Sequence, residues 1–322
     1  MLKRILILLA LLTLTNTGLS LGQQPTGPRL TPAEVKELIR SAQLRINEYR
    51  NKFKDLTADE EQEIEEYDVD GKLRRQRRIV SDLIIYQSQL DASSMSEYRN
   101  IRMVDGVTVA KRDERLVSLF ARLAKADSVK KELERINREG RRYDLDYSFY
   151  GLTLNEGLLL NENFLPYFQF TDAGREQIKG REVIVLQYQQ VAQSPDLTMK
   201  LPGELKGAGP RYRGRLWLDA ETKQLWREER ELTLEHASLS QPLVLLRFEF
   251  EYTSSSFGIL TPQRVVFITY NKGRDRAGIF PGLRLGGKTT FQYSGFRRFD
   301  VSSPDAAVTP PVKPRRQSHA VG

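Results

Sequence analysis

Apolar residues recur at helical spacing close to the start of the chain. Thr31, Pro32 and Glu34 are the residue types of a capping box with proline at the first helical position. The apolar positions that follow, down to about residue 54, are Val35, Leu38, Ile39, Ala42, Ile46, Tyr49 and Phe53. This spacing predicts an amphipathic helix whose apolar stripe lies on a sheet.

Strand patterns and turn signals dominate the rest of the sequence. Asp70-Gly71 and Asp105-Gly106 each separate two strand-like segments, which is the strongest short signal for a β-hairpin. The segments expected to form strands are 63–69, 72–89, 97–104, 107–110, 167–171, 182–190, 212–218, 224–235, 243–252, 264–270 and 289–299.

The clearest alternation lies in segment 243–252. The apolar set is Val244, Leu246, Phe248, Phe250 and Tyr252, and the charged set is Arg247, Glu249 and Glu251. Such a strand has one dry and one wet face, as in an antiparallel sheet.

Between the strand groups, residues 113–139 have the pattern of a charged amphipathic helix that ends near Gly140. The apolar stretch 152–165 fits either a short helix or a loop over apolar surface. Segments 192–210 and 273–287 are rich in proline and glycine and are expected to be long loops.

About ten to eleven strands and two substantial helices predict an α+β fold for a single domain at 31–300. A sheet of that size curls rather than staying flat. We therefore expect a strongly curved antiparallel sheet, an incomplete β-barrel, with the helices on its concave side. The apolar interior of such a sheet must be filled by helices, side chains or a ligand.

Both ends of the chain differ from this domain. Lys3 and Arg4 precede about ten apolar residues, the pattern of a signal peptide at 1–22, with cleavage expected near Gly22. An uncleaved membrane anchor is the alternative. Residues 23–30 are expected to be a linker, and 301–322 a disordered basic tail. The mature protein is accordingly expected to be periplasmic or secreted.

The composition of the chain excludes several kinds of chemical site and partner. The chain has no cysteine, which excludes disulfides, thiol nucleophiles and cysteine-based zinc sites. Its net charge is +8, or +6 without Lys3 and Arg4. An exported basic protein fits an anionic envelope surface or anionic lipid better than nucleic acid, and solubility alone is the plain alternative. At most peripheral contact with a membrane is expected.

We find no residue pattern in the sequence that is typical of a catalytic site. The two histidines, His236 and His319, have no neighbouring histidine or cysteine, and no glycine-rich motif for nucleotide binding precedes an expected helix. The acidic run from Asp59 to Glu66 lacks the ligand spacing of a calcium loop and fits a solvated strand face better. We expect no enzyme activity, catalytic residue, metal or cofactor.

Four arginines follow the first hairpin turn: Arg74, Arg75, Arg77 and Arg78. Paired across Asp70-Gly71, they would lie opposite the acidic run and form cross-strand ion pairs. The alternative is an anionic docking patch, where guanidinium groups would bind phosphate or carboxylate.

The segment from Tyr212 to Arg227 reads Tyr-Arg-Gly-Arg-Leu-Trp-Leu-Asp-Ala-Glu-Thr-Lys-Gln-Leu-Trp-Arg. Asp219 can cap its tight turn, and the next strand restarts at 222–224. This hairpin and the overall layout resemble the LolA/LolB-like outer-membrane lipoprotein carrier and sorting superfamily. The resemblance implies a leading helix against an incomplete barrel and a carrier function, and no ligand contact carries over residue by residue.

Two hypotheses for function follow. In the first, the protein is a non-catalytic carrier for a lipid or for lipoprotein acyl chains, with a cavity lined by Phe248, Phe250, Phe267 and Phe291. In the second, the same fold is an envelope interaction or stress-sensing module that binds another protein. The same aromatic face could also be an ordinary core.

Overall fold

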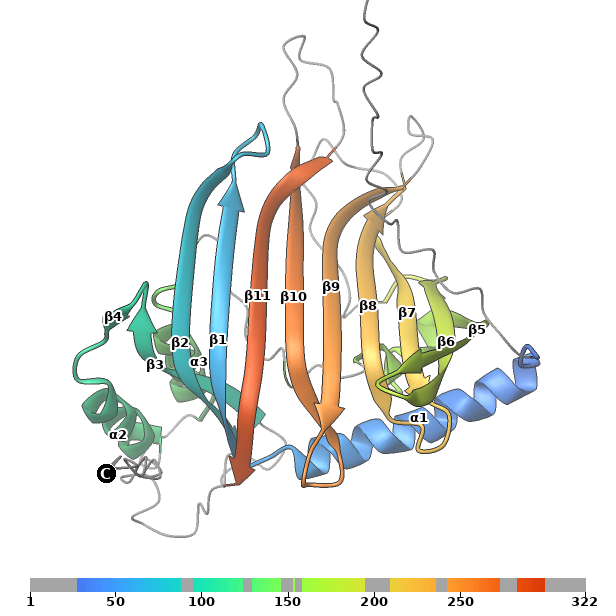
Figure 1. The fold of residues 1–322 in the computed structure, drawn as a ribbon, viewed down its shortest axis with the longest axis horizontal. Helices are drawn as coiled ribbons and strands as arrows, with labels where there is room; N and C mark the ends of the chain where they lie inside the picture. Colours follow the sequence, from blue (N-terminus) through green and yellow to red (C-terminus); the bar gives the residue numbers. More distant parts are fainter. Residues whose placement is uncertain are drawn as a thin grey trace, which may run out of the picture.

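The computed structural model describes residues 28–87, 95–123, 129–145, 153, 158–194, 209–235, 242–272 and 283–298. The predicted signal peptide at 1–22 and the tail at 301–322 lie outside these residues, as do most of the predicted linker and the larger parts of the two predicted loops. The described elements form one open sheet with helices on one side (Figure 1).

The first helix, α1 (Pro32–Lys52), is the one that the sequence predicts. Its capping box is complete, because the Glu34 amide donates to Thr31 Oγ1 at 3.3 Å and the Thr31 amide donates to Glu34 Oε2 at 2.7 Å. The predicted stripe is buried at Val35, Leu38, Ala42, Ile46 and Tyr49. Helix α1 therefore packs on the sheet through its apolar face.

Eleven antiparallel strands form a single sheet, in the order β4-β3-β2-β1-β11-β10-β9-β8-β7-β6-β5. The strands are β1 (Leu56–Tyr67), β2 (Leu73–Gln87), β3 (Met95–Val104), β4 (Val107–Thr108), β5 (Phe168–Ile178), β6 (Arg181–Gln190), β7 (Arg211–Asp219), β8 (Leu225–Leu234), β9 (Leu243–Ser254), β10 (Leu260–Lys272) and β11 (Leu283–Arg298). Strands β4 and β5 end the order, so the sheet is not closed. The predicted incomplete barrel of ten to eleven strands is confirmed.

Turn chemistry explains the hairpins. Asp105 and Gly106 have φ values of 49° and 82°, the two positive angles that a tight hairpin turn of this kind requires. The other predicted turn is longer, because β1 ends at Tyr67 and β2 begins at Leu73. The pairing between β1 and β11 joins the first and last strands, and sequence patterns alone could not place it.

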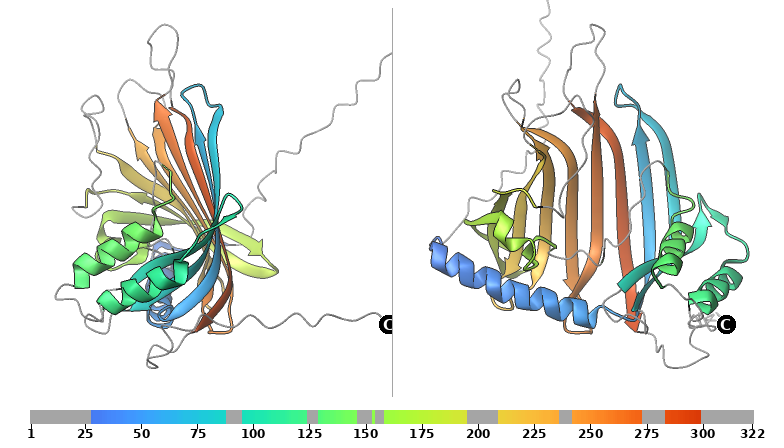
Figure 2. Two further views of the ribbon diagram at one scale, coloured as in Figure 1. Left: turned by 90° about the vertical axis from the view of Figure 1, so that its left-hand side faces the viewer. Right: turned by 180° about the vertical axis from the view of Figure 1, so that it is seen from behind.

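The single helix expected at 113–139 is in fact two helices, α2 (Arg112–Leu123) and α3 (Val129–Gly140). Asp127 and Ser128, residue types that favour helix starts, immediately precede α3 in the sequence. Both helices contact β3, and α1, α2 and α3 lie on the same side of the sheet (Figure 2).

The unsettled stretch 152–165 contributes two short 3₁₀ helices, η1 (Leu158–Leu160) and η2 (Leu165–Tyr167). Leu159 and Leu160 of η1 are almost fully buried in the core that α1 shares with the sheet. Residues 158–160 therefore form the short helix of the two alternatives, and this helix covers apolar surface.

The two faces of the sheet differ in chemistry. The inner face carries the residues that pack on α1, and Phe250, Val265 and Phe291 all belong to that one core cluster. The outer face carries a ladder of exposed or partly exposed ion pairs, for example Arg78 with Glu61 and Arg247 with Glu249. Such exposed pairs contribute roughly 0–1 kcal/mol each, so the inner face dominates stability.

Candidate ligand-binding site

The four phenylalanines predicted to line a cavity lie together on the inner face of β9, β10 and β11. Phe267 is the cross-strand partner of Phe248, and Val265 lies between Phe250 and Phe291. The ring centroids of Phe248 and Phe267 are 4.6 Å apart, and those of Phe248 and Phe250 are 5.9 Å apart. These four residues, Phe248, Phe250, Phe267 and Phe291, are called the aromatic band below.

Burial is uneven across the aromatic band. Phe250, Phe267 and Phe291 are at most 2% exposed, whereas Phe248 is partly exposed. Three of the rings therefore act as core, and Phe248 is the member through which the band reaches solvent. Aromatic pairs at these distances add about 0.5–1.5 kcal/mol to ordinary area burial.

A buried ion pair borders the aromatic band on β8. Arg230 Nε donates to Glu228 Oε1 at 2.8 Å, and both residues are at least 95% buried. The Tyr188 hydroxyl lies 3.3 Å from the same carboxylate oxygen. The Arg230 guanidinium carbon is 5.3 Å from the centroid of Phe250 and 5.9 Å from that of Phe248, within the range of cation–π attraction.

A second buried group borders the band on the other side. Arg99 of β3 donates from Nε to Glu60 Oε1 at 2.6 Å, and its Nη2 lies 3.7 Å from Glu97 Oε2. The Arg99 guanidinium carbon is 5.3 Å from the centroid of Phe291. Glu97 also accepts hydrogen bonds from the amide and hydroxyl of Thr153.

Helix α1 supports this second group. The Tyr49 hydroxyl donates to the Thr153 carbonyl at 2.8 Å, and Ser81 donates to Glu60 at 3.0 Å. Removing one partner of a buried pair costs about 3–5 kcal/mol, because the other charge stays buried. The aromatic band is thus held between two rigid polar groups.

Two tyrosines beside these polar groups have a raised pKa, mainly because they are buried. Burial, and then the negative charge of Glu228, raise the pKa of Tyr188 well above its usual value. Burial and the charge of Glu60 do the same for the pKa of Tyr293. Both phenols therefore stay neutral at physiological pH.

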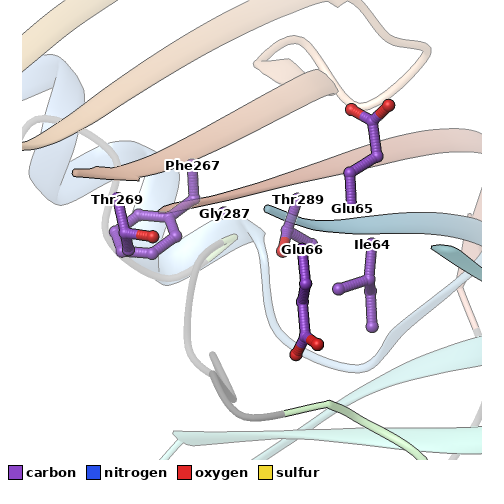
Figure 3. Close-up of a pocket in the computed structure, with 7 residues that line it drawn as sticks. All are labelled: Ile64, Glu65, Glu66, Phe267, Thr269, Gly287 and Thr289. Carbon is purple, nitrogen blue, oxygen red and sulfur yellow. The ribbon is translucent and has the colours of Figure 1, made fainter. Parts of the chain in front are cut away.

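A small crevice opens on the inner face beside Phe267 (Figure 3). Gly287 of β11 lies between Thr269 of β10 and Glu66 of β1. Because glycine has no side chain, a gap is left between the side chains of these two neighbours. In Figure 3, Ile64 and Glu66 point to this side of β1, whereas Glu65 points away. The crevice has about 10 Å³, which is space for about one water molecule.

The start of β9 is apolar on both faces. Its register with β8 shifts between Leu232 and Thr233, so that Leu246 pairs with Leu232 but Val244 pairs with Thr233. This bulge turns Val244 away from the face that Leu246 shares with Phe248, which corrects the uninterrupted alternation read from the sequence. Every residue from Leu243 to Phe248 is partly exposed.

We call this partly exposed segment, residues 243–248, the β9 rim. Apart from Arg247, all its residues are apolar, and it continues directly into the buried part of the aromatic band. Partly exposed apolar surface next to a buried aromatic group is a common feature of apolar ligand sites.

The four arginines of the predicted docking patch are divided between the faces of β2. Arg75 and Arg77 pair with inner-face residues of β1, whereas Arg78 lies opposite Glu63 on the outer face. Arg75 contacts Glu66 at 2.5 Å, Arg77 contacts Asp105 at 3.3 Å and Arg78 contacts Glu61 at 2.6 Å. Arg74 is exposed. Arg75 and Arg78 thus form cross-strand ion pairs with β1, and Arg77 pairs with the β3–β4 turn.

Among the described residues, no group of three or more histidine, cysteine or carboxylate side chains is placed to hold a metal ion. The part of the chain described by the structure also contains no helix with the length and apolar character needed to cross a bilayer.

Sequence reasoning placed the aromatic band but missed the buried charges. Glu60 belongs to the acidic run that was expected to be a solvated face, yet it is 1% exposed. Alternation along β1 puts Asp59 and Glu61 outward and Glu60 inward. The period-two alternation of the strand was therefore the sequence feature that indicated a buried position for Glu60. Its partner Arg99 is 39 residues away, a distance at which no local pattern predicts pairing.

Matches among solved structures include two proteins with low sequence identity to this chain. A DUF1329 family protein from Desulfovibrio piger has a TM-score of 0.35 and 12% identity, over 85% of this chain and 97% of that one. A candidate outer membrane lipoprotein-sorting protein domain from Vibrio parahaemolyticus has a TM-score of 0.38 and 11% identity, over 84% and 96%. No family model and no curated protein matches the sequence.

Proposed function

We propose that this chain is a non-catalytic binding protein for an acyl chain, carried by a lipid or by a lipoprotein, and that it acts outside the cytoplasm. The ligand would enter along the β9 rim and lie against Phe248. The observation that supports this most is the continuity between the partly exposed rim and the buried aromatic band.

Chemistry favours an apolar ligand here. Each methylene that leaves water contributes about 0.8 kcal/mol, so eight or nine methylenes supply about 7 kcal/mol before ordering costs. The bordering arginines are already paired with Glu228 and Glu60, which leaves the aromatic faces as the main contact surface. An acyl chain fits that surface without requiring a charged partner.

The open sheet supplies the freedom that a carrier needs. Strands β4 and β5 end the sheet order and are not joined to each other, so the inner face can change its width without breaking the ladder. The export that the first 22 residues predict would place the protein where lipoproteins are sorted. Periplasmic localisation is part of the proposal.

The direct test is uptake of a defined ligand by the full-length mature protein. We expect a fluorescent polyene fatty acid and a triacylated lipopeptide to bind competitively, with one acyl ligand seen by native mass spectrometry. A protein that takes up neither would contradict the proposal. A stoichiometric protein partner isolated without lipid would support the interaction-module hypothesis instead.

A matched pair of variants locates the site. Leu246→Gln puts an amide on the rim beside Phe248, and Leu44→Gln changes the same residue type on α1, where Leu44 is 65% exposed. An amide without a hydrogen-bond partner in an apolar contact costs about 1–3 kcal/mol. We expect about tenfold weaker fatty-acid binding for Leu246→Gln and no change for Leu44→Gln. Equal effects would place the ligand elsewhere.

A further inference from the structure

Helices α2 and α3 form a groove of about 680 Å³ at the end of the molecule away from the aromatic band. The pair lies against β3, close to the edge of the sheet, and faces the viewer in the left panel of Figure 2. The volume lies within the range typical of ligand sites.

The groove is strongly basic. Its lining contains six cationic side chains and two carboxylates, an excess of four positive charges. The cationic side chains are Lys111, Arg115, Arg122, Arg135, Arg138 and Arg142. Arg115 and Arg122 lie on α2, and Arg135 and Arg138 lie three residues apart on one face of α3. Lys111 and Arg142 flank the two helices.

One carboxylate offsets part of this charge. Glu139 lies 2.6 Å from Arg142 and 3.5 Å from Arg115, so two guanidinium groups share it. Lys111 and Arg138 are both exposed, and neither has an ion pair within the described part of the chain. Like charges that face one another across a groove repel unless an anion lies between them.

We infer that the α2–α3 groove docks the protein on a membrane surface by binding the phosphate groups of anionic phospholipids. Arginine is the residue best suited to this contact, because its planar fork donates two parallel hydrogen bonds to one phosphate. The inference deepens the proposed function, on which it rests for its choice of a lipid surface. The Arg74–Arg78 segment of β2 is the competing location, because it is the anionic docking patch that the sequence suggests.

The test measures co-sedimentation of the full chain with vesicles of phosphatidylcholine alone or mixed with phosphatidylglycerol. We expect binding only to the mixed vesicles, and loss of it at high salt, where the Debye length falls to about 3 Å. Each basic side chain near such a surface contributes about fivefold to binding. The variant K111Q/R138Q should therefore bind about 25-fold more weakly.

A charge-matched control separates the two locations. The variant K72Q/R74Q removes two exposed basic residues from the β1–β2 turn and the start of β2 and should bind like the unchanged protein. A larger loss in K72Q/R74Q than in K111Q/R138Q would overturn the inference in favour of the hairpin. Equal binding to neutral and mixed vesicles would overturn it as well.

Free inorganic phosphate is the other ligand to test, because it carries the same anionic group as a phospholipid headgroup. A thermal shift with inorganic phosphate that K111Q/R138Q abolishes, without any vesicle binding, would make the groove a site for a soluble anion and refute membrane docking. Fatty-acid uptake is measured in parallel. Uptake without vesicle binding refutes only the docking inference, and vesicle binding without uptake refutes only the proposed function.

Discussion

Tyr188 lies directly over Gly214, its cross-strand neighbour, and occupies the space where a side chain would stand. A methyl group at Gly214 would come within 2.6 Å of the Tyr188 hydroxyl oxygen, and closer still to the carbonyl oxygen of Glu229. The absent side chain lets the phenol reach Glu228 and Glu229, and this contact fixes one border of the aromatic band.

Gly214→Ala is predicted to destabilise the protein by about 3 kcal/mol or more, because backbone and a buried ring must both move. Urea unfolding followed by tryptophan fluorescence measures the change. Gly106→Ala is the control: its φ is 82° but a methyl group there meets nothing within 4 Å, so only about 1 kcal/mol of backbone strain is expected. Equal losses would show that Tyr188 does not restrict the site.

The ion pair between Arg230 and Glu228 is predicted to show strong coupling in a double-mutant cycle. Arg230→Met or Glu228→Leu alone leaves the other charge buried without compensation and should cost about 3–5 kcal/mol. Arg230→Met combined with Glu228→Leu should cost less than the sum of two single losses. Urea midpoints give the cycle, and simple additivity would refute the coupling.

The two buried tyrosines predict a loss of stability at high pH. The pKa of Tyr188 and of Tyr293 is raised by burial in the folded state, whereas an unfolded tyrosine ionises near pH 10. Their contribution is complete below pH 10 and falls as the pH rises above it, by about 1.4 kcal/mol per pH unit for each group. Unfolding free energies at pH 9, 10 and 11 measure the slope.

The matched variants are Tyr188→Phe and Tyr293→Phe, which should each lower that slope by about 1.4 kcal/mol per pH unit. Ultraviolet titration supplies an independent reading, because burial also raises the pKa of Tyr98 to about 12. A protein whose tyrosines all ionise together near pH 10 while it stays folded would contradict the burial seen in the structure.

Local chemistry made much of the fold predictable. The capping box at Thr31 and the turn at Asp105-Gly106 depend on residues within a few positions of each other, so both can be predicted from the local sequence. Alternation also placed Phe248 and Phe250 on one inner face. These features need no knowledge of which strands pair at long range.

Features that depend on pairing between distant strands could not be predicted from the sequence. Arg99 and Glu60 are on strands that meet only through β2, and a charged residue at an inward position is tolerated only with such a partner. The bulge that turns Val244 outward depends on the register between β8 and β9. The groove between α2 and α3 required the break between two helices that periodicity had joined.

Gly287 offers a test of the crevice as part of the ligand path. Gly287→Val would fill the gap between Thr269 and Glu66 with a residue type that strands favour. We expect fatty-acid binding to weaken severalfold while stability is kept. Ser294→Val, on the exposed end of the same strand, is the control and should bind normally. Unchanged binding in Gly287→Val would show that the ligand does not reach this crevice.

Asp219 is predicted to stabilise the hairpin at neutral pH and to lose that effect in acid. Burial raises the pKa of Asp219, but hydrogen bonds from Arg181, Thr222 and Trp226 outweigh it and hold the pKa far below its usual value. A lowered pKa stabilises the fold above about pH 4 and ceases to do so as the pH falls through the folded value. Asp219→Asn should therefore cost on the order of 2 kcal/mol at pH 7 and clearly less at pH 3, measured by urea unfolding. Glu221→Gln, at a side chain that is 87% exposed, should change stability by less than about 0.5 kcal/mol. A deficit in Asp219→Asn that is the same at both pH values would mean that the charge of Asp219 is not what stabilises the turn.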